Sequence, residues 1–146
     1  MQLNPEEKSR FYRCIENNKF IFYKGVLNPS DVISTLKKYD LFVFPTLYHG
    51  EGAPGVIIES FISGTPVLSS SFSQANDLIS NQETGILFNI NDQESLVSKL
   101  NWCIDNKRQI FNIGCNAQDK SKIYTREYNE KYFIDSVLGL DKEEKK

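Results

Sequence analysis

Two glutamates and three glycines crowd residues 48–60, which read YHGEGAPGVIIES. Seven residues separate Glu51 from Glu59, and Gly50, Gly52 and Gly55 lie beside or between them. An ionised carboxylate accepts two hydrogen bonds at once, which suits the vicinal diol of a ribose or of another sugar ring. Glycine lets a bulky ligand approach the backbone closely. The pattern therefore predicts a site for an elongated, hydroxylated ligand with one acid near each end.

The element that would position these acids is a turn between a strand and a helix. The run LFVFP (41–45) has the composition of a strand, so TLYHGEGAPG is the loop that leaves its carboxyl end. Pro54 suits the first residue of the following helix. Helix amino termini carry unpaired N–H groups and a positive dipole end, which can hold a phosphate without Lys or Arg. Amides for phosphates and acids for hydroxyls together describe a sugar nucleotide.

Spacing alone leaves simpler readings open. Acids near a helix start commonly complement the helix dipole as surface charge. A lone His49 can be a surface or capping residue, and glycine-rich turns are common between strands and helices. Neither a GxGxxG nor a Walker pattern is present.

The rest of the chain alternates strand-like and helix-like segments. Helix amino termini are predicted at Asn4, Asn28 and Asn91, each followed by proline or an acid within a few residues. Strands are predicted at 20–26, 41–45, 66–70 and 85–90, and helices at about 5–17, 107–121 and 125–138. This rhythm indicates an α/β fold, a doubly wound, Rossmann-like parallel sheet with helices on both faces and a ligand crevice at the carboxyl ends of its strands. Because such sheets usually begin with a strand, the first strand is expected to be missing upstream.

Composition limits the class of protein. A chain of 146 residues with a formal charge of −2 fits one soluble domain and argues against an electrostatic grip on nucleic acid or an anionic membrane. The three cysteines, Cys14, Cys103 and Cys115, have neither zinc-ligand nor disulfide-framework spacing. No stretch predicts a membrane span or a signal peptide, so a cytoplasmic location is expected. Residues 139–146 are expected to form a frayed, solvated tail.

Several motifs in register resemble the carboxyl-terminal half of the retaining nucleotide-sugar glycosyltransferases with the two-domain GT-B fold, the family 4 or group 1 enzymes. The segment KFIFYKGVLNPSDVISTLKKYDLFVFPT is similar to the family's V-x-F-x-G … L-x-x-x-Y-x-x-A-D-x-F-x-x-P-S pattern. EGAPGVIIES is similar to E-G-x-P-x-V-x-x-E-A, SGTPVLSS to x-G-x-P-V-x-x-S, and NQETGILF to x-x-x-T-G-x-L-x. The resemblance covers about residues 19–89.

The resemblance implies a role for each matching residue. Glu51 would contact hydroxyls of the donor sugar as the catalytic acidic residue, and Glu59 would bind the ribose diol. The donor-binding set is completed by amides around Gly55 and Val56 for the diphosphate and by the turn at Gly25 and Val26 near the base. Gly52 and Thr46 belong to the same loop, and Thr46 stands where serine is frequent in the family.

The resemblance also implies the reaction and the partners. Residues 1–146 would be a nucleotide-sugar donor-binding domain, without the family's basic Arg and Lys pair and without its acceptor-binding amino-terminal domain. The full-length enzyme would be a hexosyltransferase-like enzyme that transfers a glycosyl unit from a nucleoside diphosphate sugar to an acceptor sugar or lipid-linked glycan with retention, in polysaccharide or glycoconjugate synthesis. No cofactor and no metal are expected, and membrane association would be peripheral at the inner face. In place of the glycine-rich turn G-G-x-x-E stands SFSQANDLIS, with Asp77 in the acid's place.

Three other functions fit parts of the pattern. A non-catalytic nucleotide-sugar binding or interaction module is the main alternative, and a sugar-nucleotide epimerase of related fold is another. A phosphoacceptor receiver domain shares the doubly wound pattern but needs an acidic pair after its first strand, which this sequence lacks. The isolated chain is expected to be catalytically silent.

Overall fold

The computed structural model describes residues 4–47 and 52–138 of the chain. Its centre is a parallel sheet of three strands in the order β1, β2, β3. The strands are β1 (Phe42–Phe44), β2 (Val67–Ser70) and β3 (Ile86–Phe88). Phe42 pairs with Val67, and Leu68 pairs with Ile86, so each strand lies beside the next one along the chain.

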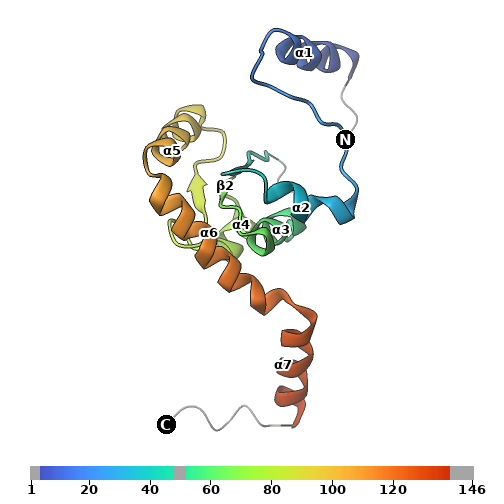
Figure 1. Ribbon diagram of the computed structural model, residues 1–146, viewed down its shortest axis with the longest axis vertical. Helices are drawn as coiled ribbons and strands as arrows, with labels where there is room; N and C mark the ends of the chain where they lie inside the picture. The colour runs from blue at the N-terminus through green and yellow to red at the C-terminus, as the bar shows by residue number, and fades with distance from the viewer. Residues whose placement is uncertain (1–3, 48–51, 139–146) are drawn as a thin grey trace.

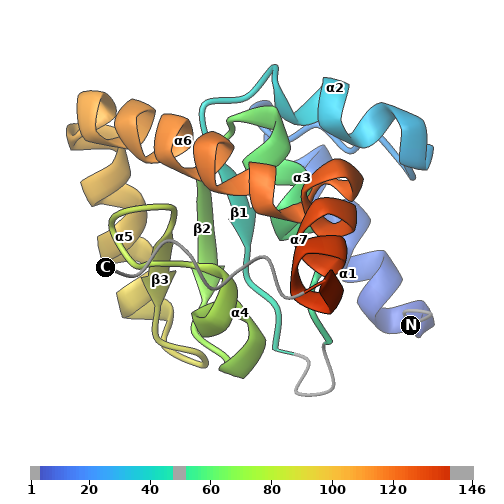
Figure 2. The same ribbon diagram turned by 90° about the horizontal axis from the view of Figure 1, so that it is seen from below.

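Helices connect and cover these strands. They are α1 (Pro5–Glu16), α2 (Val32–Leu36), α3 (Gly55–Ser63), α4 (Ser73–Leu78), α5 (Gln93–Asp105), α6 (Lys107–Ser121) and α7 (Arg126–Leu138), with short 3₁₀ turns η1 (Pro29–Asp31) and η2 (Lys122–Tyr124). Figure 2 shows the strands side by side with helices packed around them. The predicted α/β class, a parallel sheet with helices, is confirmed.

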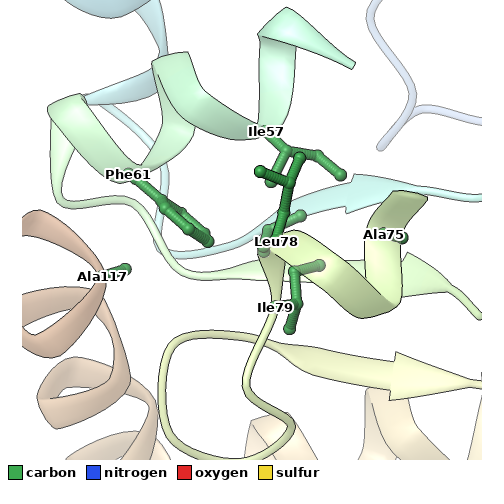
Figure 3. Close-up of a cluster of buried hydrophobic side chains, with 7 residues drawn as sticks. Ile57, Phe61, Ala75, Leu78, Ile79 and Ala117 are labelled. Atoms are coloured by element: carbon green, nitrogen blue, oxygen red, sulfur yellow. The ribbon is translucent and has the colours of Figure 1, made fainter. Parts of the chain in front are cut away.

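The core consists of one apolar cluster on each face of the sheet, because neighbouring residues of a strand point to opposite faces. Val67 of β2 joins Ile57 and Phe61 of α3 together with residues of α4 and α6 (Figure 3). Leu68, the next residue, packs instead with Ile86 of β3 and with side chains of α5 and α6. The central strand is therefore buried on both sides, as the apolar run PVLSS predicts.

Local sequence signals explain where the helices begin. In α1, the Asn4 side chain accepts from the Glu7 amide at 2.8 Å and the Glu7 carboxylate accepts from the Asn4 amide at 3.0 Å, which is the predicted capping box. At α5 the cap is Asp92 and not the predicted Asn91, which instead takes a positive φ of 61°. The bond from the Ser95 amide, followed by the one from the Asn89 side chain, lowers the pKa of the Asp92 carboxyl below its ordinary value.

The predicted strand at 20–26 is wrong. These residues have no ladder partner in the described part of the chain, and Phe20, Phe22 and Val26 are largely exposed. Tyr23 meets Phe11 of α1 edge-on at 5.4 Å between ring centroids, and the Phe20 and Phe22 rings contact the ammonium groups of Lys19 and Lys24. A strand needs a neighbour to satisfy its backbone groups, and neither α1 nor the surrounding coil supplies one. Figure 1 shows α1 and this segment standing apart from the helices around the sheet.

The other predicted elements are present with small shifts. Predicted strands 41–45, 66–70 and 85–90 correspond to β1, β2 and β3, and helices 107–121 and 125–138 correspond to α6 and α7. Helix α4 was not predicted from the sequence. The predicted tail at 139–146 lies outside the described residues.

Candidate functional site

The crevice is predicted at the carboxyl ends of the strands. The chain leaves β1 through Pro45, Thr46 and Leu47, and α4 starts soon after β2 at the same end of the sheet (Figure 2). Helix α3 begins at Gly55, one residue later than predicted, because Pro54 is its N-cap. In open parallel sheets, ligands bind in the crevice outside these carboxyl ends.

The amino terminus of α3 offers unpaired donors. The N-cap Pro54 is extended, with φ −72° and ψ 106°, and no side chain of a described residue caps the helix. Its carbonyl accepts from the Ile57 amide at 2.9 Å. The amides of Gly55 and Val56 have no acceptor among the described residues. These two amides and the positive end of the helix dipole make a suitable site for an anionic group such as a phosphate.

Glu59 lies on the side of α3 that continues from these amides. It follows Gly55 by four residues and Val56 by three, and such residues are neighbours on a helix surface. Its side chain is half-buried and has neither a hydrogen bond nor an ion pair with another described residue. The helix buries a different face, with Ile57 and Phe61 fully enclosed in the core. The Glu59 carboxylate is therefore not used by the fold within the described part of the chain.

The glycines of this region have open space around them. A Cβ atom built on Gly52 or on Gly55 would meet nothing within 4 Å. Neither residue has the positive φ that favours glycine. Packing of the described residues does not account for glycine here, and glycine at these positions leaves room for a ligand to approach the backbone.

The residue that follows the predicted turn at Gly25 and Val26 lies near α3. Gly25 has a φ of +76°, which favours glycine, and Val26 is 95% exposed. The next residue, Leu27, and Val56 of α3 both line a groove of about 440 Å³ beside β1. Leu27 therefore shares a groove with Val56, whereas Gly25 and Val26 are not among the residues that line it.

Thr46 is held by a residue that sequence reasoning did not select. Its carbonyl accepts from the Ser70 hydroxyl at 2.7 Å, across 24 positions in the chain. Ser70 is fully buried at the end of β2. The sequence offers two signals, a polar residue at the end of an apolar strand and the serine that ends the family-like pattern x-G-x-P-V-x-x-S, but neither predicted a bond to Thr46.

Glu51, His49 and Gly50 lie outside the described residues. The predicted role of Glu51 therefore stays a prediction from the sequence. Asp77, in the place of the family's acid after β2, is exposed on α4.

A second hollow lies at the opposite end of the sheet. It measures about 370 Å³ and is lined by residues that precede β1 and β2 and by the junction of α5 and α6, including Leu41, Pro66, Cys103 and Ile110. Burial raises the pKa of the Cys103 thiol. None of the predicted site residues is found there.

Across residues 4–47 and 52–138, no three His, Cys, Asp or Glu side chains gather in a way that would hold a metal ion. None of the described helices is long and apolar enough to cross a bilayer.

Comparison with known proteins identifies a matching family model and several relatives. Residues 4–120 match the family model described as glycosyl transferases group 1. The chain is 29% identical over 117 residues to the capsular polysaccharide biosynthesis glycosyltransferase CapM of Staphylococcus aureus, covering 80% of this chain and 30% of that protein. It is 35% identical over 84 residues to the UDP-Gal:alpha-D-GlcNAc-diphosphoundecaprenol alpha-1,3-galactosyltransferase of Escherichia coli, covering 58% of this chain and 21% of that protein. The chain thus spans less than a third of the length of these relatives.

Solved structures share the fold. Anabaena Alr3699/HepE in complex with UDP superposes with a TM-score of 0.76 at 20% identity, covering 92% of this chain and 37% of that one. The C-terminal domain of the group 1 family protein LpcC from Francisella tularensis gives a TM-score of 0.64 at 19% identity, over 84% of this chain and 60% of that one. These likenesses agree with the expected half of a GT-B fold. The family model matches residues 4–120, well over half of the chain, and the chain therefore belongs to the group 1 glycosyl transferases.

Proposed function

We propose that this chain is the donor-binding part of a retaining glycosyltransferase that uses a UDP-sugar. The observation that carries the proposal is the start of α3, where the unpaired amides of Gly55 and Val56 share a helix side with the unengaged carboxylate of Glu59. The amides suit the diphosphate, and the carboxylate suits the ribose diol. A relative named for UDP-Gal, and structures in complex with UDP and UDP-glucose, support uracil as the base.

The proposed mechanism relies on position and charge. The bond between the anomeric carbon and the diphosphate oxygen breaks, the acceptor oxygen bonds to the same face of that carbon, and the acceptor proton passes to the departing phosphate. Amides at the helix start would stabilise the negative charge that develops on the diphosphate. Glu51 is proposed to hold hydroxyls of the donor sugar, so that the anomeric carbon is correctly oriented.

The remaining parts of the proposal concern the whole protein. The acceptor is proposed to be a sugar or lipid-linked glycan, bound by sequence beyond this chain, in polysaccharide or glycoconjugate synthesis. CapM, named for capsular polysaccharide biosynthesis, supports this assignment. Cytoplasmic location, peripheral contact with the membrane and independence of a cofactor stay predictions.

Calorimetric titration tests the donor assignment. The chain is titrated with UDP, UDP-glucose, GDP and ADP under the same conditions. We expect weak binding of UDP and of UDP-glucose, and weaker or no binding of the two purine nucleotides. Equal affinities for all four ligands would contradict the choice of uracil as the base. No binding of any of them would contradict the donor site.

A non-catalytic nucleotide-sugar binding module is the second candidate. Transfer assays on the longest natural polypeptide that contains this chain separate the two. Formation of a glycosylated acceptor supports the transferase, whereas UDP-sugar binding without any transfer or hydrolysis supports the module.

A further inference from the structure

Ser70 is a buried hydroxyl at the end of the central strand. Its exposed fraction is 0%, as are those of its strand neighbours Val67 and Leu68. A hydroxyl taken out of water costs free energy unless it is hydrogen-bonded. Ser70 meets this requirement by donating to the Thr46 carbonyl at 2.7 Å.

The hydrogen bond lies just past the end of the strand pairing. The ladder between β1 and β2 ends with Phe44 beside Ser69. Through its side chain, Ser70 connects β2 to the chain two residues beyond the end of β1.

The same end of β2 also holds its other neighbours. The Ser71 amide donates to the Phe88 carbonyl at 2.8 Å, at the end of β3. The Ser71 hydroxyl donates to the Asn76 side-chain oxygen on α4 at 2.9 Å. Two consecutive serines therefore join three segments at the carboxyl ends of the strands, where the crevice is predicted.

We propose that Ser70 is a positioning residue of the donor site. It fixes Thr46, and with it the start of the segment that leaves β1, at the end of the sheet where α3 begins. Ser70 itself has no contact with the donor in this proposal. The inference rests on the proposed function for its effect on binding, although the attachment of Thr46 can be measured without a ligand.

The test compares Ser70→Ala with Ser69→Ala. Ser69 is also fully buried on β2, but its hydroxyl donates to the Ser70 carbonyl of its own strand at 3.0 Å and does not reach the loop. Two readouts are taken for each variant: amide hydrogen exchange of a peptide containing Thr46 and Leu47, and calorimetric affinity for UDP. Thermal melting reports the general cost of losing a buried hydroxyl.

Ser70→Ala is expected to speed exchange at Thr46 and Leu47 and to weaken UDP binding by about fivefold, the effect of one neutral hydrogen bond. Ser69→Ala is expected to change neither readout, even where its melting temperature falls equally. Ser70→Cys, which keeps the volume with a much weaker donor, is expected to behave like Ser70→Ala and serves where the alanine variant does not fold.

Two outcomes would overturn the proposal: unchanged exchange and affinity in Ser70→Ala and Ser70→Cys, or the same changes in Ser69→Ala. If the unsubstituted chain binds no UDP, the proposed function fails, and exchange at Thr46 and Leu47 alone then decides whether Ser70 fixes this segment.

Discussion

Glu59 permits the sharpest test of the donor site at the scale of a residue. Glu59→Ala should weaken UDP binding about tenfold to a hundredfold, because hydrogen bonds to a charged group contribute about 1.5–3 kcal/mol. The melting temperature should change little, since the carboxylate has no partner among the described residues. Calorimetric titration with UDP gives the affinity.

Two variants control this experiment. Glu59→Gln keeps the shape of the side chain but loses the charge and one acceptor. Its UDP affinity should therefore fall between those of the unsubstituted chain and of Glu59→Ala. Glu127→Ala removes an exposed carboxylate on α7 and should leave the affinity unchanged. Titration with uridine, which keeps the ribose diol but has no phosphate, separates the contact of Glu59 with the diol from the contact of the α3 amides with the diphosphate. A Glu59→Ala variant with undiminished affinity would contradict the role of Glu59.

Gly55 tests whether a ligand comes close to the backbone. A Cβ atom would have open space there, and alanine favours helix more than glycine does, so Gly55→Ala should leave the melting temperature unchanged or slightly raised. Affinity for UDP should nevertheless fall, because the added methyl group would separate the phosphate from the amides. Calorimetry and thermal melting of the same sample measure both effects. Unchanged affinity would place the diphosphate elsewhere.

Part of the site could be predicted from local sequence and part could not. Gly55, Val56 and Glu59 are placed by a strand-to-helix turn and the helical repeat, both of which are local patterns. The bond from Ser70 to Thr46 joins residues 24 positions apart and depends on where the ladder ends. No spacing rule contains that information.

At the scale of elements, packing decided between correct and wrong predictions. β1, β2 and β3 were predictable because short apolar runs bounded by turn residues are typical of buried parallel strands. The segment 20–26 has the same composition but no strand neighbour among the described residues. Composition records the tendency to form a strand and not the presence of its partner.

Gly114 tests the contact between α6 and the end of α3. A Cβ atom there would lie 2.5 Å from the Gly64 carbonyl oxygen and 3.2 Å from the Pro66 ring. Gly114→Ala should therefore lower the free energy of unfolding by about 1–3 kcal/mol, the usual cost of overpacking, despite a gain in helix propensity. Gly55→Ala, with open space at its Cβ, is the matched control. Chemical denaturation measures both, and equal stability of the two variants would refute the close contact.

At the scale of the whole molecule, two apolar surfaces are not covered by the described residues. One is the segment 20–27, with Phe20, Phe22 and Val26 at 77%, 71% and 95% exposure. The other is α7, where Phe133 and Val137 are 67% and 66% exposed. Figure 1 shows both standing away from the sheet and its helices. Soluble monomers rarely expose large continuous apolar patches, so we expect these surfaces to drive association.

Self-association is the prediction that follows. The chain should form dimers or larger species as its concentration rises, because burying apolar area contributes about 25 cal/mol per Å². The double variant Phe22→Asp with Phe133→Asp should shift the chain toward monomer, as measured by size-exclusion chromatography with light scattering. Asn112→Asp, which adds negative charge at an exposed polar position of α6, controls for charge alone and should not dissociate the species. A chain that stays monomeric at every concentration, or an Asn112→Asp variant that dissociates as fully as the double variant, would show that these apolar surfaces do not hold the copies together.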